Sequence, residues 1–148
     1  MSLFDKISGA RQQSQLTLGP AEAFAAIALI GVAADGYAAE AEEQTLLITL
    51  SRMQLFRSYP ADVTEKMIDR LLGILQRQGA EILLAAALAA LPHELQETVF
   101  AVTADIVLAD GEVTEEEEEF LNHLYRALEI PEETAIKIID VMLIKNRG

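Results

Sequence analysis

The chain has no cysteine among its 148 residues, which excludes disulfides, thiolate metal sites and cysteine nucleophiles. Aromatic residues are also scarce, at 5% of the chain, although 51% of the residues are hydrophobic. The apolar excess is made of Ala, Leu and Ile. This composition favours closely packed helices over sheets.

Long apolar segments are missing as well. The longest apolar run, Ile82 to Leu91, is far shorter than the ~20 residues that a membrane-spanning helix requires. Residues 1–20 lack the apolar stretch and small-residue cleavage site that direct export. We therefore expect a cytoplasmic protein.

Basic residues are few. The chain has 11 Lys and Arg and 24 Asp and Glu, which gives a formal net charge of −13. Residues 75–148 carry −10 of this charge and residues 1–74 carry −3. A field of this sign repels phosphate backbones and anionic lipid headgroups and attracts cations or basic protein surfaces. We expect a divalent cation or a basic protein segment as partner, with no nucleic acid and no membrane.

Sequence patterning divides the chain into an arm and one domain. Residues 1–19 contain the apolar residues Leu3, Phe4 and Ile7 followed by a polar run, and we expect them to form an N-terminal arm. An amphipathic membrane anchor is the alternative for this arm, but it would be very short and carries few cations. We expect residues 20–148 to form a single all-α domain.

Apolar periodicity and helix start and stop signals predict about seven helices in this domain. Their expected ranges are 20–34, 39–56, 62–78, 80–91, 92–109, 115–129 and 131–145. Asp62 or Thr64 is expected to cap the third helix, and Thr114 the sixth. The fourth helix, at 80–91, is apolar on every side, so we expect it in the centre of the domain.

An internal repeat relates the two halves of the chain. Shifting the sequence by 75 residues aligns residues 33–43 with residues 108–118. Each unit consists of a helix, an Asp-Gly turn and a second helix, and a Glu follows seven residues after the Asp. Glycine permits the positive φ of a tight turn. We expect two units, at about residues 20–56 and 95–130, related by a pseudo-twofold axis.

The candidate metal ligands are the aligned acidic residues Asp35, Glu42, Asp110 and Glu117. If the units pack about a twofold axis, the four carboxylates converge, and such a cluster repels itself unless a cation or protons are present. We therefore expect a composite site for Ca²⁺, Mg²⁺, Mn²⁺ or Zn²⁺. The alternative is helix capping, because an acidic residue near a helix N-terminus gains ~0.3–1 kcal/mol from the helix dipole without any ligand.

A self-contained EF-hand loop is excluded in both units. In the second unit Gly111 and Glu117 match loop positions 6 and 12, but positions 1 and 3, which need oxygen ligands, hold Ile106 and Leu108. The first unit also lacks oxygen side chains at these two positions. Any calcium-like site therefore has to draw ligands from both units.

The other acidic residues of the second unit have a simpler explanation. The run from Glu115 to Glu119 is more typical of a solvated helix start than of a site, and the repeat singles out Glu117 alone. His123 follows Glu119 by four residues and shares a helical face with it, but one carboxylate and one imidazole are a weak metal signal. A structural histidine is the preferred interpretation.

The doubled Asp-Gly-x-x-x-x-x-Glu pattern in an all-helical chain of this length resembles the TerB family of tellurite-resistance proteins. Residues 2–7, Ser-Leu-Phe-Asp-Lys-Ile, are similar to the start of that family, and residues 108–121 are the closer match of the two units. The resemblance implies a cytosolic helical domain with an acidic metal-binding site, associated with tellurite and stress resistance. It implies no characterised enzymatic activity.

Three functions are compatible with these features. We favour a non-enzymatic module that binds a metal ion or a basic protein segment, in tellurite, metal or general stress resistance. The alternative is an Mg²⁺-dependent phosphoryl or pyrophosphate hydrolase that uses the same carboxylates, with Glu115 and Glu118 as a Glu-x-x-Glu pair. Against it, the chain has no basic or Gly-rich phosphate cradle. A third candidate is an adaptor that docks through its acidic second half and binds no metal.

Overall fold

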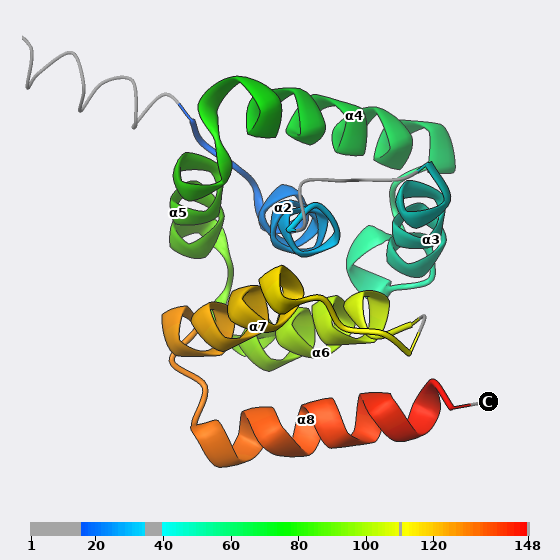
Figure 1. The fold of residues 1–148 in the computed structure, drawn as a ribbon. Coiled ribbons are helices and arrows are strands. Elements are labelled where there is room, and N and C mark those ends of the chain that lie inside the picture. The colour runs from blue at the N-terminus through cyan, green and yellow to red at the C-terminus, as the bar shows by residue number, and fades with distance from the viewer. Residues whose placement is uncertain (1–15, 35–39, 110, 148) are drawn as a thin grey trace, which may run out of the picture.

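The computed structural model describes residues 16–34, 40–109 and 111–147 (Figure 1). In these residues the chain forms seven α-helices and no strand, which confirms the predicted all-α domain. The helices are α2 (Pro20–Val32), α3 (Glu40–Ser51), α4 (Ala61–Gln78), α5 (Ala80–Ala90), α6 (Gln96–Val107), α7 (Glu115–Ala127) and α8 (Glu132–Lys145). There are also two short 3-10 helices. The first, η1 (Gln54–Phe56), follows α3, and the second, η2 (His93–Leu95), precedes α6.

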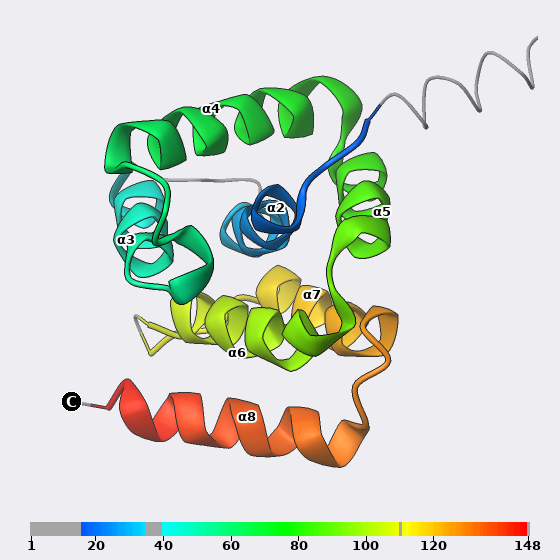
Figure 2. The ribbon, with the colours of Figure 1, turned by 180° about the vertical axis from the view of Figure 1, so that it is seen from behind.

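Helix α2 lies at the centre of the domain, surrounded by α3, α4, α5, α6 and α7 (Figures 1 and 2). Every residue from Ala23 to Val32 is buried. The sequence of α2 suits this position because no charged residue follows Glu22 and five of its residues are alanine. Small side chains let the surrounding helices approach the α2 backbone closely.

At Gly31, two helices approach the backbone of α2 closely. A Cβ atom on this residue would lie 2.6 Å from Cγ2 of Thr103 on α6 and 3.1 Å from Cε2 of Phe120 on α7. Glycine is therefore the residue that lets α6 and α7 both pack against the C-terminal end of α2.

The expectation that the helix at 80–91 occupies the centre is wrong. Helix α5 buries Leu83, Leu84 and Ala87 against the core, while Ile82 remains 39% exposed and the far side of the helix faces solvent. Both α2 and α5 are apolar around their circumference. Composition could not distinguish them, because the number of helices that surround each one is set by the packing of the whole chain.

The largest differences from the predicted helix boundaries are at the end of α3 and at the start of α6. Helix α3 ends at Ser51, and the predicted remainder to residue 56 is an irregular turn followed by η1. Helix α6 begins at Gln96 because η2 precedes it. Neither predicted cap of α4 is correct, since its N-cap is Pro60, Asp62 lies in the first turn, and Thr64 is fully buried.

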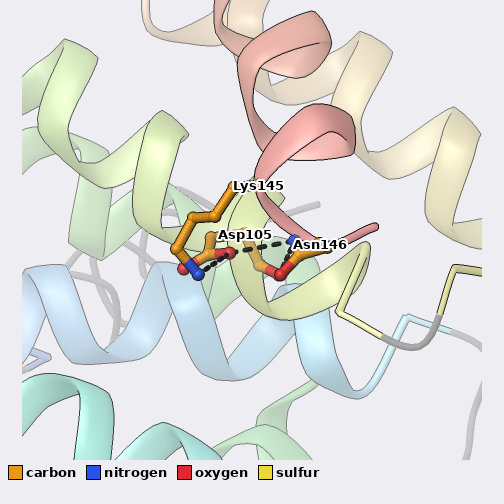
Figure 3. Close-up of polar contacts among 3 residues, drawn as sticks. All are labelled: Asp105, Lys145 and Asn146. Atoms are coloured by element: carbon orange, nitrogen blue, oxygen red, sulfur yellow. Dashed lines mark hydrogen bonds and ion pairs between the residues drawn. The ribbon is translucent and has the colours of Figure 1, made fainter. Parts of the chain in front are cut away.

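Helix α8 covers the outer side of α6. Polar contacts to Asp105 of α6 hold its C-terminal end (Figure 3). Lys145 Nζ lies 3.2 Å from Asp105 Oδ1, and Asn146 Nδ2 donates to the same oxygen at 3.0 Å and to the Asp105 backbone oxygen at 3.4 Å. These contacts fix where α8 lies along the axis of α6.

The two predicted units keep the offset of 75 residues where their helices border the turns. Helices α2 and α6 end at Val32 and Val107, and helices α3 and α7 begin at Glu40 and Glu115. Helix α2 contacts α6, and the contacts of α2 with α7 and of α3 with α6 are reciprocal, as a twofold relation requires. The pseudo-twofold itself stays a prediction.

None of the helices in the described ranges combines the length and the apolar character that crossing a bilayer requires. Leu18 is buried in the core cluster and Leu16 packs partly against it. The described chain therefore packs on the domain from a few residues before α2.

Candidate functional site

Of the four predicted metal ligands, Glu117 alone has a described side chain. Asp35 and Asp110 lie outside the described residues, and Glu42 is described only as part of the α3 backbone. Convergence of the four carboxylates on one cation therefore stays a prediction.

Glu117 takes part in a reciprocal capping box at the N-terminus of α7. Its backbone N–H donates to Oγ1 of Thr114 at 3.1 Å, and the Thr114 N–H donates to Oε1 of Glu117 at 2.9 Å. Thr114 is the N-cap of α7, which confirms that prediction, and Glu117 is only 9% exposed. One oxygen of the Glu117 carboxylate thus satisfies a backbone N–H that the helix leaves without a partner.

The second turn has the backbone conformation that its glycine predicts. Gly111 has a φ of 79°, in the left-handed region that favours glycine. A Cβ atom here would meet nothing within 4 Å, so the backbone conformation, and not a lack of space, selects glycine.

An open cleft of about 700 Å³ lies where the end of α2 meets α4 and α7. Most of the apolar residues that line it are buried or half-buried, among them Ile30, Leu72, Leu75 and Phe120. Its polar lining comes mainly from exposed residues of α7 and consists of Glu43, Gln76, Glu116, Glu119 and His123. No lysine or arginine is among the described residues that line the cleft.

The position of the α7 residues follows from helical geometry. Residues at i, i+3, i+4 and i+7 lie on one face of a helix, and this spacing relates Glu116, Glu119, Phe120 and His123. Glu117 lies on the adjacent buried face, where it serves the cap. The repeat drew attention to Glu117 and left Glu116 and Glu119 as part of a solvated run. The helical spacing of Glu116 and Glu119 to Phe120 and His123 is the sequence signal that would have identified the face of α7 toward the cleft.

The carboxylates whose side chains are described in the cleft do not form a compact metal site. No group of three or more His, Asp and Glu side chains that could hold a metal ion occurs in the part of the chain that the structure describes. Glu43, Glu116 and Glu119 instead border a mainly apolar hollow. Such an arrangement suits a ligand that brings both apolar groups and positive charges.

The pair proposed for the hydrolase alternative lies elsewhere. Glu115 and Glu118 are exposed on α7 and do not line the cleft. A smaller hollow of about 100 Å³ between α3 and α4 shares Glu43 with the cleft and adds Glu65 and Asp69. The acidic surface therefore continues from the cleft across α3 and α4.

Comparison with protein-family models, with curated proteins and with solved structures found no match for this chain. The resemblance to the TerB family stays a prediction carried by the residues of the two turns and by residues 2–7.

Proposed function

We propose that this chain is a non-enzymatic binding module whose cleft between α2, α4 and α7 receives a basic, amphipathic segment of a partner protein. The observation that carries the proposal is the combination, in one cleft, of apolar side chains with carboxylates and no described cationic side chain. Of the two partners that the sequence predicts, this combination favours the basic protein segment.

The apolar part of the cleft favours a protein segment over a bare cation. Burying apolar surface contributes roughly 25 cal/mol per Å², and a metal ion has no such surface to bury. A helix that lays its apolar face into a groove gains this free energy through side chains spaced at i, i+4 and i+7. The half-buried Phe120 lines the cleft together with Leu75 of α4 and the exposed acids of α7, and it is a suitable contact for such a side chain.

The charge of the molecule favours the same partner. The chain carries a formal net charge of −13, and carboxylates continue from the cleft to Glu65 and Asp69. A field of one sign steers oppositely charged partners and raises their association rate, and dissolved salt screens it. Binding should therefore weaken as the salt concentration rises.

The proposal is tested with a fluorescent synthetic helix of leucine and lysine at helical spacing, using a leucine and glutamate helix as the matched peptide control. Fluorescence anisotropy should show that the basic peptide binds to the protein and that the acidic control peptide does not. Replacing two cleft carboxylates, as Glu116→Gln with Glu119→Gln, should raise its Kd about fivefold if each exposed charge contributes ~0.5 kcal/mol.

A second double variant controls for total charge. Glu132→Gln with Glu133→Gln removes two exposed carboxylates from α8 and touches no cleft residue. Its Kd should stay close to that of the unaltered chain. Equal weakening in both double variants would show that the overall field, and not the cleft, governs binding. Absence of binding to the basic peptide at low salt would contradict the proposal itself.

A role in tellurite, metal or general stress resistance is what the family resemblance implies for this module. It is tested by the survival of tellurite-treated cells that express the unaltered chain or the variant Glu116→Gln with Glu119→Gln. Protection by the unaltered chain alone would connect the cleft to resistance. Hydrolysis of inorganic pyrophosphate in the presence of Mg²⁺ is the corresponding assay for the enzyme alternative.

A further inference from the structure

A second groove, of about 730 Å³, lies on the outer side of α5, away from the acidic cleft. Helix α5 forms one side of it through residues that include Ile82, Ala85 and Ala89, and the segment Leu16–Leu18 forms the other. Glu81 is the single charged residue of the described lining. The groove is thus an apolar surface with one negative charge at the start of α5.

This side of α5 is unusual for the outside of a domain. A surface helix normally turns polar residues toward water, but α5 has Ile82 39% exposed and alanines on the same side. Contiguous exposed apolar surface marks an interaction site more often than a free surface.

We propose that residues 1–15 of the same chain occupy this groove. These residues lie outside the described ranges and join the domain at Leu16, which is itself part of the groove wall. They supply Leu3, Phe4 and Ile7 as apolar groups. The occupant is therefore already attached at the edge of the surface that it would cover.

Length and charge both suit this occupant. Helix α5 has 11 residues and is about 16 Å long, and 15 residues reach further than that whether helical or extended. The segment contains Lys6 and Arg11 against Asp5 alone, so its positive charge complements Glu81.

The covalent connection favours this occupant over the alternatives. A short tether gives a binding segment an effective concentration of about 1 mM, so a weak contact suffices, whereas a second copy of the chain must overcome dilution. An anionic bilayer is a poorer occupant because the net charge of −13 repels its headgroups. The segment thus shields the exposed side of α5 within one molecule.

The test is the rate at which trypsin cleaves after Arg11 in the full-length protein, followed by mass spectrometry. The unaltered chain is compared with Phe4→Ser in the segment, Ile82→Asp in the groove, and the combination of both. Ile136→Asp on α8, where the side chain is 59% exposed, is the matched control. Circular dichroism checks that each variant keeps its helices, and Phe4→Ser probes the contact without altering the described domain.

Occupancy of the groove for roughly nine-tenths of the time slows cleavage about tenfold, because proteolysis follows the population of the open form. Phe4→Ser and Ile82→Asp should each remove this protection, their combination should add nothing further, and Ile136→Asp should leave the rate unchanged. Equal rates in all variants would overturn the proposal. So would protection that depends on protein concentration, which indicates a second copy, or protection that appears only with phosphatidylglycerol vesicles, which indicates a bilayer.

Discussion

The Glu117 carboxylate accepts a hydrogen bond from the Thr114 N–H at the start of α7, and this contact can be separated from any metal contact by substitution. Glutamine keeps an acceptor oxygen and loses the charge, whereas alanine loses both. We expect Glu117→Ala to lower the free energy of unfolding by about 1 kcal/mol and Glu117→Gln to change it far less. Urea denaturation of the two variants measures the difference, and equal stabilities would show that the cap contributes nothing.

The predicted composite cation site is tested by a charge-neutral variant that keeps this cap. A cation that binds the folded chain raises its stability by ~2.7 kcal/mol at a hundredfold excess over Kd. We expect Ca²⁺, Mg²⁺, Mn²⁺ or Zn²⁺ to raise the melting temperature of the unaltered chain and not that of Asp110→Asn with Glu117→Gln. The exposed pair Glu115→Gln with Glu118→Gln is the control and should retain the increment. If metal raised the melting temperature of Asp110→Asn with Glu117→Gln as much as that of the unaltered chain, helix capping would be the better explanation of Glu117.

At the scale of helices, two glycines allow a matched comparison of packing with helix propensity. A Cβ atom at Gly31 would lie 2.6 Å from the Thr103 methyl group between α2 and α6, whereas at Gly73 of α4 its nearest neighbour is the Arg77 guanidinium, at 3.1 Å. The exposed Arg77 side chain can move away, and the buried Thr103 cannot.

We therefore expect opposite signs for the two alanine substitutions. Gly31→Ala should lower the free energy of unfolding by about 1–3 kcal/mol through overpacking. Gly73→Ala should raise it by about 0.5–1 kcal/mol, because alanine has the higher helix propensity. Chemical denaturation of both variants makes the comparison, and stabilisation by Gly31→Ala would mean that α6 and α7 yield at this crossing.

At the scale of the whole molecule, the formal net charge of −13 governs which polymers approach. DNA binding requires cationic side chains that displace counterions from phosphates, and this chain has 11 lysines and arginines against 24 acids. We expect no binding to duplex DNA at physiological salt. A complex at sub-micromolar protein concentration in a gel shift would contradict this expectation.

Local chemistry made much of the structure predictable. The seven helices follow from apolar periodicity and from stop signals, the N-cap at Thr114 from its hydroxyl group, and the positive φ of Gly111 from its missing Cβ atom. Each of these depends on residues within one or two turns of one another. A single sequence is sufficient for such features because the interactions that produce them are short in range.

Tertiary packing decided the rest. The sequence marked α5 as the central helix, but α2 takes that place, and both are apolar on all sides. The acidic cleft joins Ile30, Leu72 and Glu119, which are far apart in the chain. Periodicity shows which residues share a helical face and not which helix that face will meet, because that depends on how the chain as a whole best excludes water from its apolar surface.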